Sequence, residues 1–116
     1  MKTIKTLAIC AAALLATEAS AMSGNELKDN ADAYVRVSQG AHYLPDVSNA
    51  GIFSGYVQAI AKSSVSFPFC LSKDVTLGQT YAVVVKYLND NPAKWNQYAS
   101  KLIRDAMTQA FPCAEE

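Results

Sequence analysis

The stretch that decides the fold is TLGQTYAVVVKYLNDNP, residues 76–92. It opens with a capping box, in which the Thr76 side chain accepts a hydrogen bond from the Gln79 amide and the Gln79 side chain reaches back to Thr76. Apolar residues then follow the 3.6-residue period of a helix, at Leu77, Tyr81, Val84, Val85 and Leu88. The valines at 83–85 alone would also suit a strand, but the capping box and the length of the pattern favour a helix.

After this helix the chain predicts a turn and one more helix. Asn91 is placed to cap the new helix, with Pro92 at its first position. The new helix stops at residues 111–113, and its apolar residues are Tyr98, Leu102, Ile103, Ala106, Met107 and Ala110. On the other side of residue 76, the stretch 65–73 is expected to be an extended connection, because Pro68 disfavours helical conformation at Phe67.

Two further helices are expected before this connection, at residues 25–38 and 48–64, with a loop at 40–47. The inward stripe of the first is Leu27, Ala31, Tyr34, Val35 and Ser38, and that of the second is Ile52, Tyr56, Ala59, Ile60 and Ser63. Small residues in the second helix (Gly51, Ser54 and Gly55) would let a neighbouring element approach closely. The sequence therefore predicts an all-α fold, a compact small helical bundle of four or five helices.

The first 21 residues have the order of a secretory signal peptide. Lys2 and Lys5 precede an apolar run at 7–16, and the small residues at 19–21 supply a signal-peptidase site. The run is about half the roughly 20 residues that a transmembrane helix needs. We therefore expect residues 1–21 to be cleaved and residues 22–116 to form the mature domain, without stable membrane insertion. The alternative is a lipoprotein signal at Cys10, which fits its neighbours less well.

Composition favours one folded domain with one cross-link. The chain has 116 residues, no formal net charge and 51% hydrophobic residues, which argues against a nucleic-acid partner and against disorder. Of the three cysteines, Cys10 falls in the signal segment. In an oxidising compartment we expect Cys70 and Cys113 to form a disulfide, which closes a loop of about 43 residues. Two buried free thiols are the alternative.

Catalytic and metal-binding patterns are missing from the sequence. His42 is the only histidine, and the nearby Ser38, Asp46 and Ser48 do not by sequence proximity supply the geometry of a catalytic triad. There is no second histidine and no Cys-x-x-Cys pair to hold a metal. We therefore expect a protein that is not an enzyme and that uses no cofactor or metal.

Aromatic residues are frequent after the signal segment, where all 6 Tyr, 4 Phe and the single Trp lie. Most of them fall on helix stripes and are expected in the core. Trp95 differs because it lies in a polar stretch, residues 89–97, where an aromatic side chain can anchor a partner. The alternative is that Trp95 folds down as a lid on the core.

An ordered set of short motifs resembles the Rap/Tai family of type VI secretion amidase-effector immunity proteins. The set is FCLSKDVTLGQ at 69–79, VVVKYL at 83–88, NP at 91–92 and AFPC at 110–113, and residues 24–27 and 51–59 also fit the family pattern. The resemblance implies an all-helical, often homodimeric immunity domain at 22–116. Such a protein binds a peptidoglycan-cleaving amidase in the periplasm and occludes its active site.

The candidate occluding element is the polar stretch 89–97, together with the exposed face of the helix before it. The candidate partner-binding residues are Lys86, Asp90, Asn91, Lys94, Trp95 and Asn96. This hypothesis rests on polarity and on Trp95. The alternative function is a periplasmic structural or stress protein, holdase-like, with no specific effector. A third function, a cell-wall enzyme, would have to depend on His42.

Overall fold

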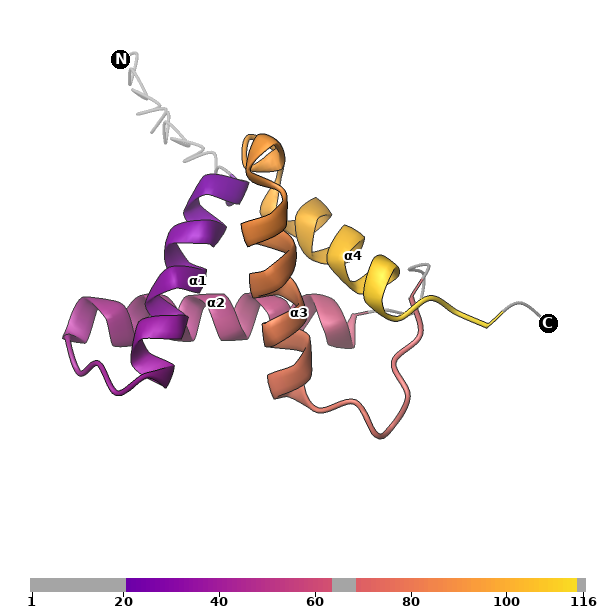
Figure 1. Cartoon of the computed structure of the whole chain (residues 1–116), viewed down its shortest axis with the longest axis horizontal. Helices are drawn as coiled ribbons and strands as arrows, with labels where there is room; N and C mark the ends of the chain where they lie inside the picture. The colour runs from indigo at the N-terminus through magenta and orange to yellow at the C-terminus, as the bar shows by residue number, and fades with distance from the viewer. Residues whose placement is uncertain (1–20, 64–68, 115–116) are drawn as a thin grey trace, which may run out of the picture.

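A computed structural model describes residues 21–63 and 69–114 and shows an all-α fold (Figure 1). Within these ranges the elements are α1 (Gly24–Ser38), α2 (Leu44–Lys62), α3 (Leu77–Asp90), the 3-10 helix η1 (Pro92–Lys94) and α4 (Ala99–Ala110). The expected compact helical bundle with one disulfide is confirmed. Residues 1–20 of the predicted signal peptide (1–21), residue 64 at the end of the second predicted helix and residues 65–68 of the predicted extended connection lie outside the described residues.

Capping boxes start two of the helices. The Thr76 side chain accepts a hydrogen bond from the Gln79 amide at 3.1 Å, and the Thr76 amide donates to the Gln79 side chain at 2.7 Å, as predicted. The same arrangement starts α1, where Ser23 and Glu26 make bonds of 3.2 and 2.7 Å. Because a capping box satisfies two otherwise unpaired amides, both helices have a defined first residue.

The prediction for α2 was wrong in its start and right only in part for its inward face, because Tyr56 and Ile60 do pack half-buried against the core. The helix begins at Leu44, not near residue 48, and its buried residues are Ala50, Phe53, Val57 and Ala61. Ile52, expected to point inward, is 45% exposed. Apart from the backbone of α2 itself, no described atom lies within 4 Å of a Cβ built at Gly51 or Gly55, so none of the described elements makes the expected close approach. Apolar residues surround α2, and periodicity therefore could not select the inward side.

The last helix also differs from its prediction. It begins only at Ala99, after η1 and a short turn, and Tyr98 is 65% exposed rather than in the core. Pro92 does begin η1, but the Asn91 side chain does not cap it. Instead, the Asn91 side-chain amide donates a hydrogen bond to the Tyr87 carbonyl at 2.8 Å, back into the last turn of α3.

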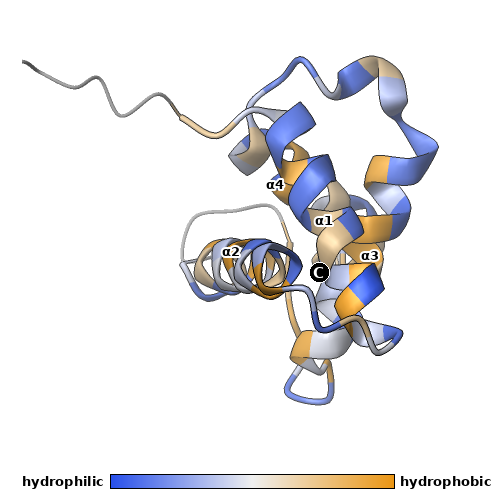
Figure 2. Ribbon diagram, turned by 90° about the vertical axis from the view of Figure 1, so that its left-hand side faces the viewer, coloured by the Kyte–Doolittle hydropathy of each residue, from blue (hydrophilic) through white to orange (hydrophobic). Residues whose placement is uncertain are grey.

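All four α-helices of the described residues contribute buried side chains to one core, and α4 supplies Leu102, Ile103 and Met107. Phe53 of α2 is fully buried, and its ring centroid lies 5.2 Å from that of Tyr34 and 6.2 Å from that of Tyr81. Figure 2 shows α2 end-on beside the other three helices, so that one of its sides faces away from them. No helix within residues 21–63 and 69–114 has both the length and the apolar character to cross a membrane.

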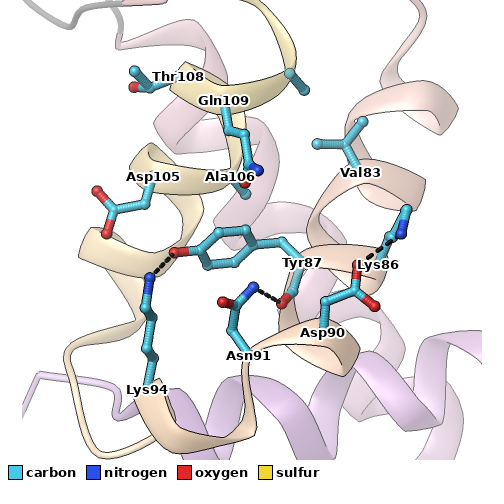
Figure 3. A pocket seen from close by; sticks show the side chains of 11 residues that line it. Val83, Lys86, Tyr87, Asp90, Asn91, Lys94, Asp105, Ala106, Thr108 and Gln109 are labelled. Atoms are coloured by element: carbon cyan, nitrogen blue, oxygen red, sulfur yellow. Dashed lines mark hydrogen bonds and ion pairs between the residues drawn. The ribbon is translucent and has the colours of Figure 1, made fainter.

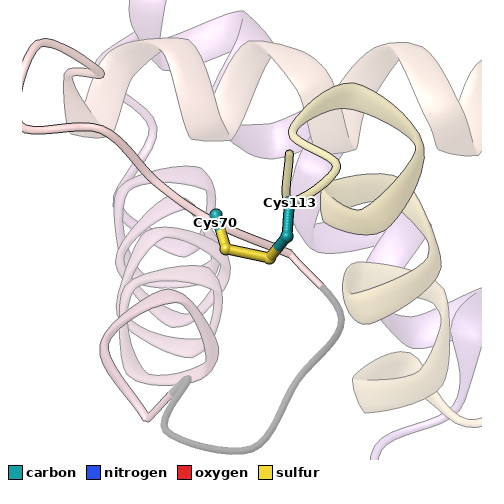
Figure 4. The surroundings of a disulfide bond; sticks show 2 residues. All are labelled: Cys70 and Cys113. Atoms are coloured by element: carbon teal, nitrogen blue, oxygen red, sulfur yellow. A yellow bond between two sulfur atoms is a disulfide. The ribbon is translucent and has the colours of Figure 1, made fainter. Parts of the chain in front are cut away.

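The disulfide between Cys70 and Cys113 is formed, as predicted, with the Cα atoms 4.8 Å apart (Figure 4). Next to it, the Cys70 amide donates to the Phe111 carbonyl at 2.9 Å, and Phe69 and Pro112 form an isolated antiparallel bridge. The segment before α3 is thereby fastened to the end of α4.

One two-pronged ion pair closes the turn between α1 and α2. The Arg36 side chain donates to both carboxylate oxygens of Asp46, at 2.9 and 2.8 Å. This hydrogen bonding lowers the pKa of Asp46 and raises the pKa of Arg36. A carboxylate whose pKa is lowered by folding stabilises the fold above its unfolded pKa, near 3.9, and loses that contribution as the pH falls through the folded value.

We therefore predict a small, pH-dependent effect of Asp46→Asn. The variant should unfold at a lower temperature than the wild type at pH 7, and the gap should close as the pH falls below about 4. Thermal unfolding followed by circular dichroism between pH 2.5 and 7 measures this gap. Asp105→Asn is the control, because the Lys101–Asp105 pair joins neighbouring turns of one helix and links no separate elements. A gap that stays constant across this range would contradict the prediction.

Candidate partner-binding site

A groove of about 750 Å³ lies between α3, η1 and α4 (Figure 3). The end of α3 supplies one wall, and the second half of α4 supplies the other. The lining residues are Val83, Lys86, Tyr87, Asp90, Asn91, Lys94, Asp105, Ala106, Thr108, Gln109 and Ala110. Four of the six candidate partner-binding residues therefore meet in one place: Lys86, Asp90, Asn91 and Lys94.

Tyr87 forms the floor of the groove. Its side chain points from α3 across the groove, and the residue is 8% exposed (Figure 3). The Lys94 ammonium donates to the Tyr87 hydroxyl at 3.3 Å and lies 5.6 Å from the centroid of its ring. A cation over an aromatic face is attracted by the electrons of the ring, so Lys94 is held at the mouth of the groove.

The rim carries charges of both signs. Lys86 and Asp90 form an ion pair of 2.6 Å on the outer surface of α3, with side chains 78% and 56% exposed. Asp105, on the α4 side, pairs with Lys101 at 2.6 Å. With two lysines and two aspartates along its lining, the groove suits a partner surface that offers both donors and acceptors rather than an anion.

Trp95 and Asn96 do not line this groove. The Trp95 indole nitrogen donates to the Leu88 carbonyl at 2.8 Å, and the Lys28 ammonium lies 5.2 Å from its ring centroid. Trp95 is thus half-buried between the last turn of α3 and the first turns of α1, where it covers the core as a lid. Asn96 is exposed on the turn that follows η1.

The turn after η1 is fastened to the start of α1. The Gly24 amide donates to the Gln97 carbonyl at 2.7 Å, and the Ala99 amide donates to the Met22 carbonyl at 2.9 Å. A Cβ at Gly24 would lie 2.6 Å from the Trp95 carbonyl oxygen, so the two backbones approach more closely than any side chain permits. The connection between α3 and α4 is therefore held in one conformation at its base.

Tyr98 is the surface residue that the sequence missed. Its backbone pairs with Ser23 in an antiparallel bridge, and its side chain is 65% exposed. Tyrosine offers a large contact area with little conformational entropy to lose, which suits an anchor on a pre-organised segment. Helical periodicity placed Tyr98 inside, because nothing local signals that the helix begins one residue later.

Groups for catalysis do not gather around the groove. His42 is exposed on the connection between α1 and α2 and is not among the lining residues. Within residues 21–63 and 69–114, no three His, Cys, Asp or Glu side chains are placed to hold a metal ion. What the site offers is a shaped surface of hydrogen-bonding groups beside a stiff connection.

Fold and site together define a small disulfide-linked helical domain with a polar groove between its last two helices. The sequence matches the family of Rap1a immunity proteins over residues 5–113, and the chain belongs to this family. This agrees with the family resemblance of the sequence motifs. A search of curated proteins found no significant match.

Proposed function

We propose that this protein is a periplasmic immunity protein that binds a peptidoglycan amidase effector of type VI secretion and occludes its active site. The observation that carries the proposal is the stiff, exposed connection between α3 and α4 beside the groove. Membership of the Rap1a immunity protein family supports the immunity role. In this proposal the protein performs no chemistry, and bound inhibitor excludes substrate from the cleft of the enzyme. We include homodimerisation, which the sequence resemblance implies.

The structure gives the residues of the connection different tasks. Lys94, Asn96 and Tyr98 are exposed and would contact the amidase, with Lys86, Asp90 and Asn91 at the groove rim. Trp95 would act by holding the connection on the core, through its bond to the Leu88 carbonyl. Because the connection is ordered before binding, little conformational entropy is lost when the partner docks.

Alanine replacement of Lys94, Asn96 and Tyr98 together should weaken binding at least about 30-fold, the loss typical of an interface hot spot. The unfolding temperature should stay near that of the wild type, because all three side chains are exposed. Trp95→Ala should lower both affinity and unfolding temperature. The measurement is calorimetric titration with a peptidoglycan amidase effector inactivated at its nucleophile, sought first as the product of the adjacent gene.

Tyr43→Ala is the matched control for this experiment. Tyr43 is 67% exposed and lies in the turn after α1, whereas the connection is fastened to the start of α1. Its replacement should leave affinity unchanged. Unchanged affinity in the triple variant, with the wild type binding the amidase, would remove the connection from the mechanism. A wild type that neither binds the amidase nor protects cells from it in the periplasm would overturn the proposed function itself.

One observation favours the alternative, a holdase for unfolded clients. Large apolar side chains are exposed around the start of α2, with Leu44 at 79%. Such surface can bind unfolded chains. The two functions separate on partner choice, because a holdase suppresses aggregation of unrelated proteins, whereas an immunity protein binds one folded enzyme at fixed stoichiometry.

A further inference from the structure

The groove between α3, η1 and α4 contains a hydroxyl group that still has a hydrogen to donate. Tyr87 is 8% exposed, and its side chain points across the groove (Figure 3). The hydroxyl oxygen accepts a hydrogen bond of 3.3 Å from the Lys94 ammonium, which leaves the hydroxyl hydrogen for another acceptor. None of the described residues supplies that acceptor. Because polar groups of buried residues are normally paired, this hydroxyl points to an acceptor from outside the chain.

The lining of the groove also has one charge without a partner. Lys86 pairs with Asp90 at 2.6 Å. Asp105 pairs with Lys101, also at 2.6 Å. Lys94 forms no ion pair with any carboxylate in the described part of the chain. The groove therefore carries both signs, but only the positive charge of Lys94 is left for a partner to neutralise.

The unused hydroxyl hydrogen and the unpaired ammonium lie side by side. The Lys94 ammonium is held over the Tyr87 ring, 5.6 Å from its centroid, by the attraction of a cation to an aromatic face. One acceptor group beside both can therefore receive a hydrogen bond from each. A carboxylate fits best, because it accepts through two oxygens and its negative charge matches Lys94. A carbonyl or hydroxyl group would accept the hydrogen bonds but leave the charge of Lys94 unneutralised.

We infer that Tyr87 and Lys94 form a carboxylate subsite, and that an aspartate or glutamate side chain of the partner enzyme occupies it. The inference rests on the proposed function and names the chemistry of one contact within the groove. The Lys94 ammonium pairs with the carboxylate, and the Tyr87 hydroxyl donates to one of its oxygens. Asp105 does not repel the incoming group strongly, because its own charge is offset by Lys101.

The open shape of the groove favours a carboxylate carried on a protein surface over a free acid. The groove has a volume of about 750 Å³, and Lys94 at its mouth is exposed. Exposed ion pairs contribute little by themselves, so two donors hold a small free carboxylate only weakly. An acidic side chain of a folded enzyme makes this contact together with those at the rim, where charges of both signs are available.

Tyr87→Phe tests the subsite with little disturbance, because it removes the hydroxyl and keeps the ring beneath Lys94. In calorimetric titration with the inactivated amidase, its affinity should be at least about 10-fold lower than that of the wild type, the loss expected for a hydrogen bond to a charged group. Lys94→Met should lower affinity at least as much. The double variant should lose less than the product of the two single losses, because both donors act on one carboxylate. Tyr81→Phe, a half-buried tyrosine on the same helix outside the groove, is the matched control and should bind like the wild type.

Variants of the enzyme identify the carboxylate. When the surface Asp and Glu residues of the amidase are changed in turn to Asn and Gln, one variant should bind the wild-type protein at least about 10-fold more weakly. The same variant should show no further loss against Lys94→Met, because the partner of its carboxylate is already absent.

The possible outcomes separate the inference from the proposed function. Wild-type affinity in both Tyr87→Phe and Lys94→Met would overturn the inference and leave the proposed function in place. If both variants bind weakly but no acidic residue of the amidase matters, the acceptor is not an enzyme carboxylate, and the inference is again overturned. In that case, a shift of the Tyr87 ring signals in nuclear magnetic resonance with sodium acetate, but not with sodium chloride at equal ionic strength, would assign the subsite to a free carboxylate. A wild type that does not bind the amidase would overturn the proposed function and the inference with it.

Discussion

Removing the disulfide by the double replacement Cys70→Ser/Cys113→Ser should lower the free energy of unfolding by about 4 kcal/mol. The bond closes a loop with a sequence separation of 43 residues, and the chain-entropy model gives about that stabilisation for a loop of this length. For a domain of this size, about 4 kcal/mol is a large part of a total of about 5 to 15 kcal/mol. Urea denaturation monitored by circular dichroism gives the free energy directly.

The double variant is preferable to either single one, because a lone thiol could cross-link two molecules. Treating the wild type with reductant under the same conditions should reproduce the lower stability, while leaving the double variant unchanged. Loss of the disulfide should loosen the groove more than the rest of the domain. The disulfide and the hydrogen bond from the Cys70 amide to the Phe111 carbonyl both fasten the end of α4 that lines the groove. A decrease below about 1 kcal/mol would show that the Phe69–Pro112 bridge and the core hold this end without the bond.

Gly24→Ala should destabilise the protein by about 3 kcal/mol, at the upper end of the usual cost of overpacking. Its Cβ would lie 2.5 Å from Leu102 Cδ1, 2.6 Å from the Trp95 carbonyl oxygen and 2.9 Å from Trp95 Cα. Two of these atoms are backbone, so the strain cannot be relieved by rotating a side chain. Either the start of α1 or the connection after η1 must move, and the 2.7 Å bond from Gly24 to Gln97 would be lost.

Gly78→Ala is the control for this prediction. Gly78 lies in the first turn of α3, and a Cβ there would be 3.8 Å from the nearest atom, the Thr76 hydroxyl oxygen. The control should unfold at the wild-type temperature or slightly above it. Amidase affinity is the second readout, because Gly24 fixes the base of the connection that carries Lys94 and Tyr98. Equal stability of the two alanine variants would mean that the close backbone contact at Gly24 is not required.

Local signals in the sequence were enough for the helices that have them. The capping box at Thr76 and Gln79 gave the start of α3, and the pair Ser23 and Glu26 carries the same pattern at α1. The two cysteines outside the predicted signal peptide gave the disulfide. These features depend on residues close in sequence or on the redox chemistry of a compartment, so they can be recognised without the fold.

What the sequence could not predict depends on contacts between distant residues. The inward face of α2 could not be chosen because both of its sides are apolar, and only packing against Tyr34 and Tyr81 selects Phe53. Trp95 takes the lid position that the sequence left open as an alternative, whereas Tyr98, expected in the core, is exposed because its bridge to Ser23 turns the chain just before α4. Four of the candidate partner-binding residues lie together in the groove, because the polar residues of α3 and η1 cluster in sequence as well as in space.

The two isolated bridges fasten α4 at both ends to earlier parts of the chain. One end of α4 is held by the segment at the start of α1, and the other by the segment before α3. With only 12 residues, α4 is too short to be stable alone in water. Its helical form therefore depends on packing against the rest of the domain. The groove, one wall of which is α4, depends in turn on contacts between distant parts of the chain rather than on α4 alone.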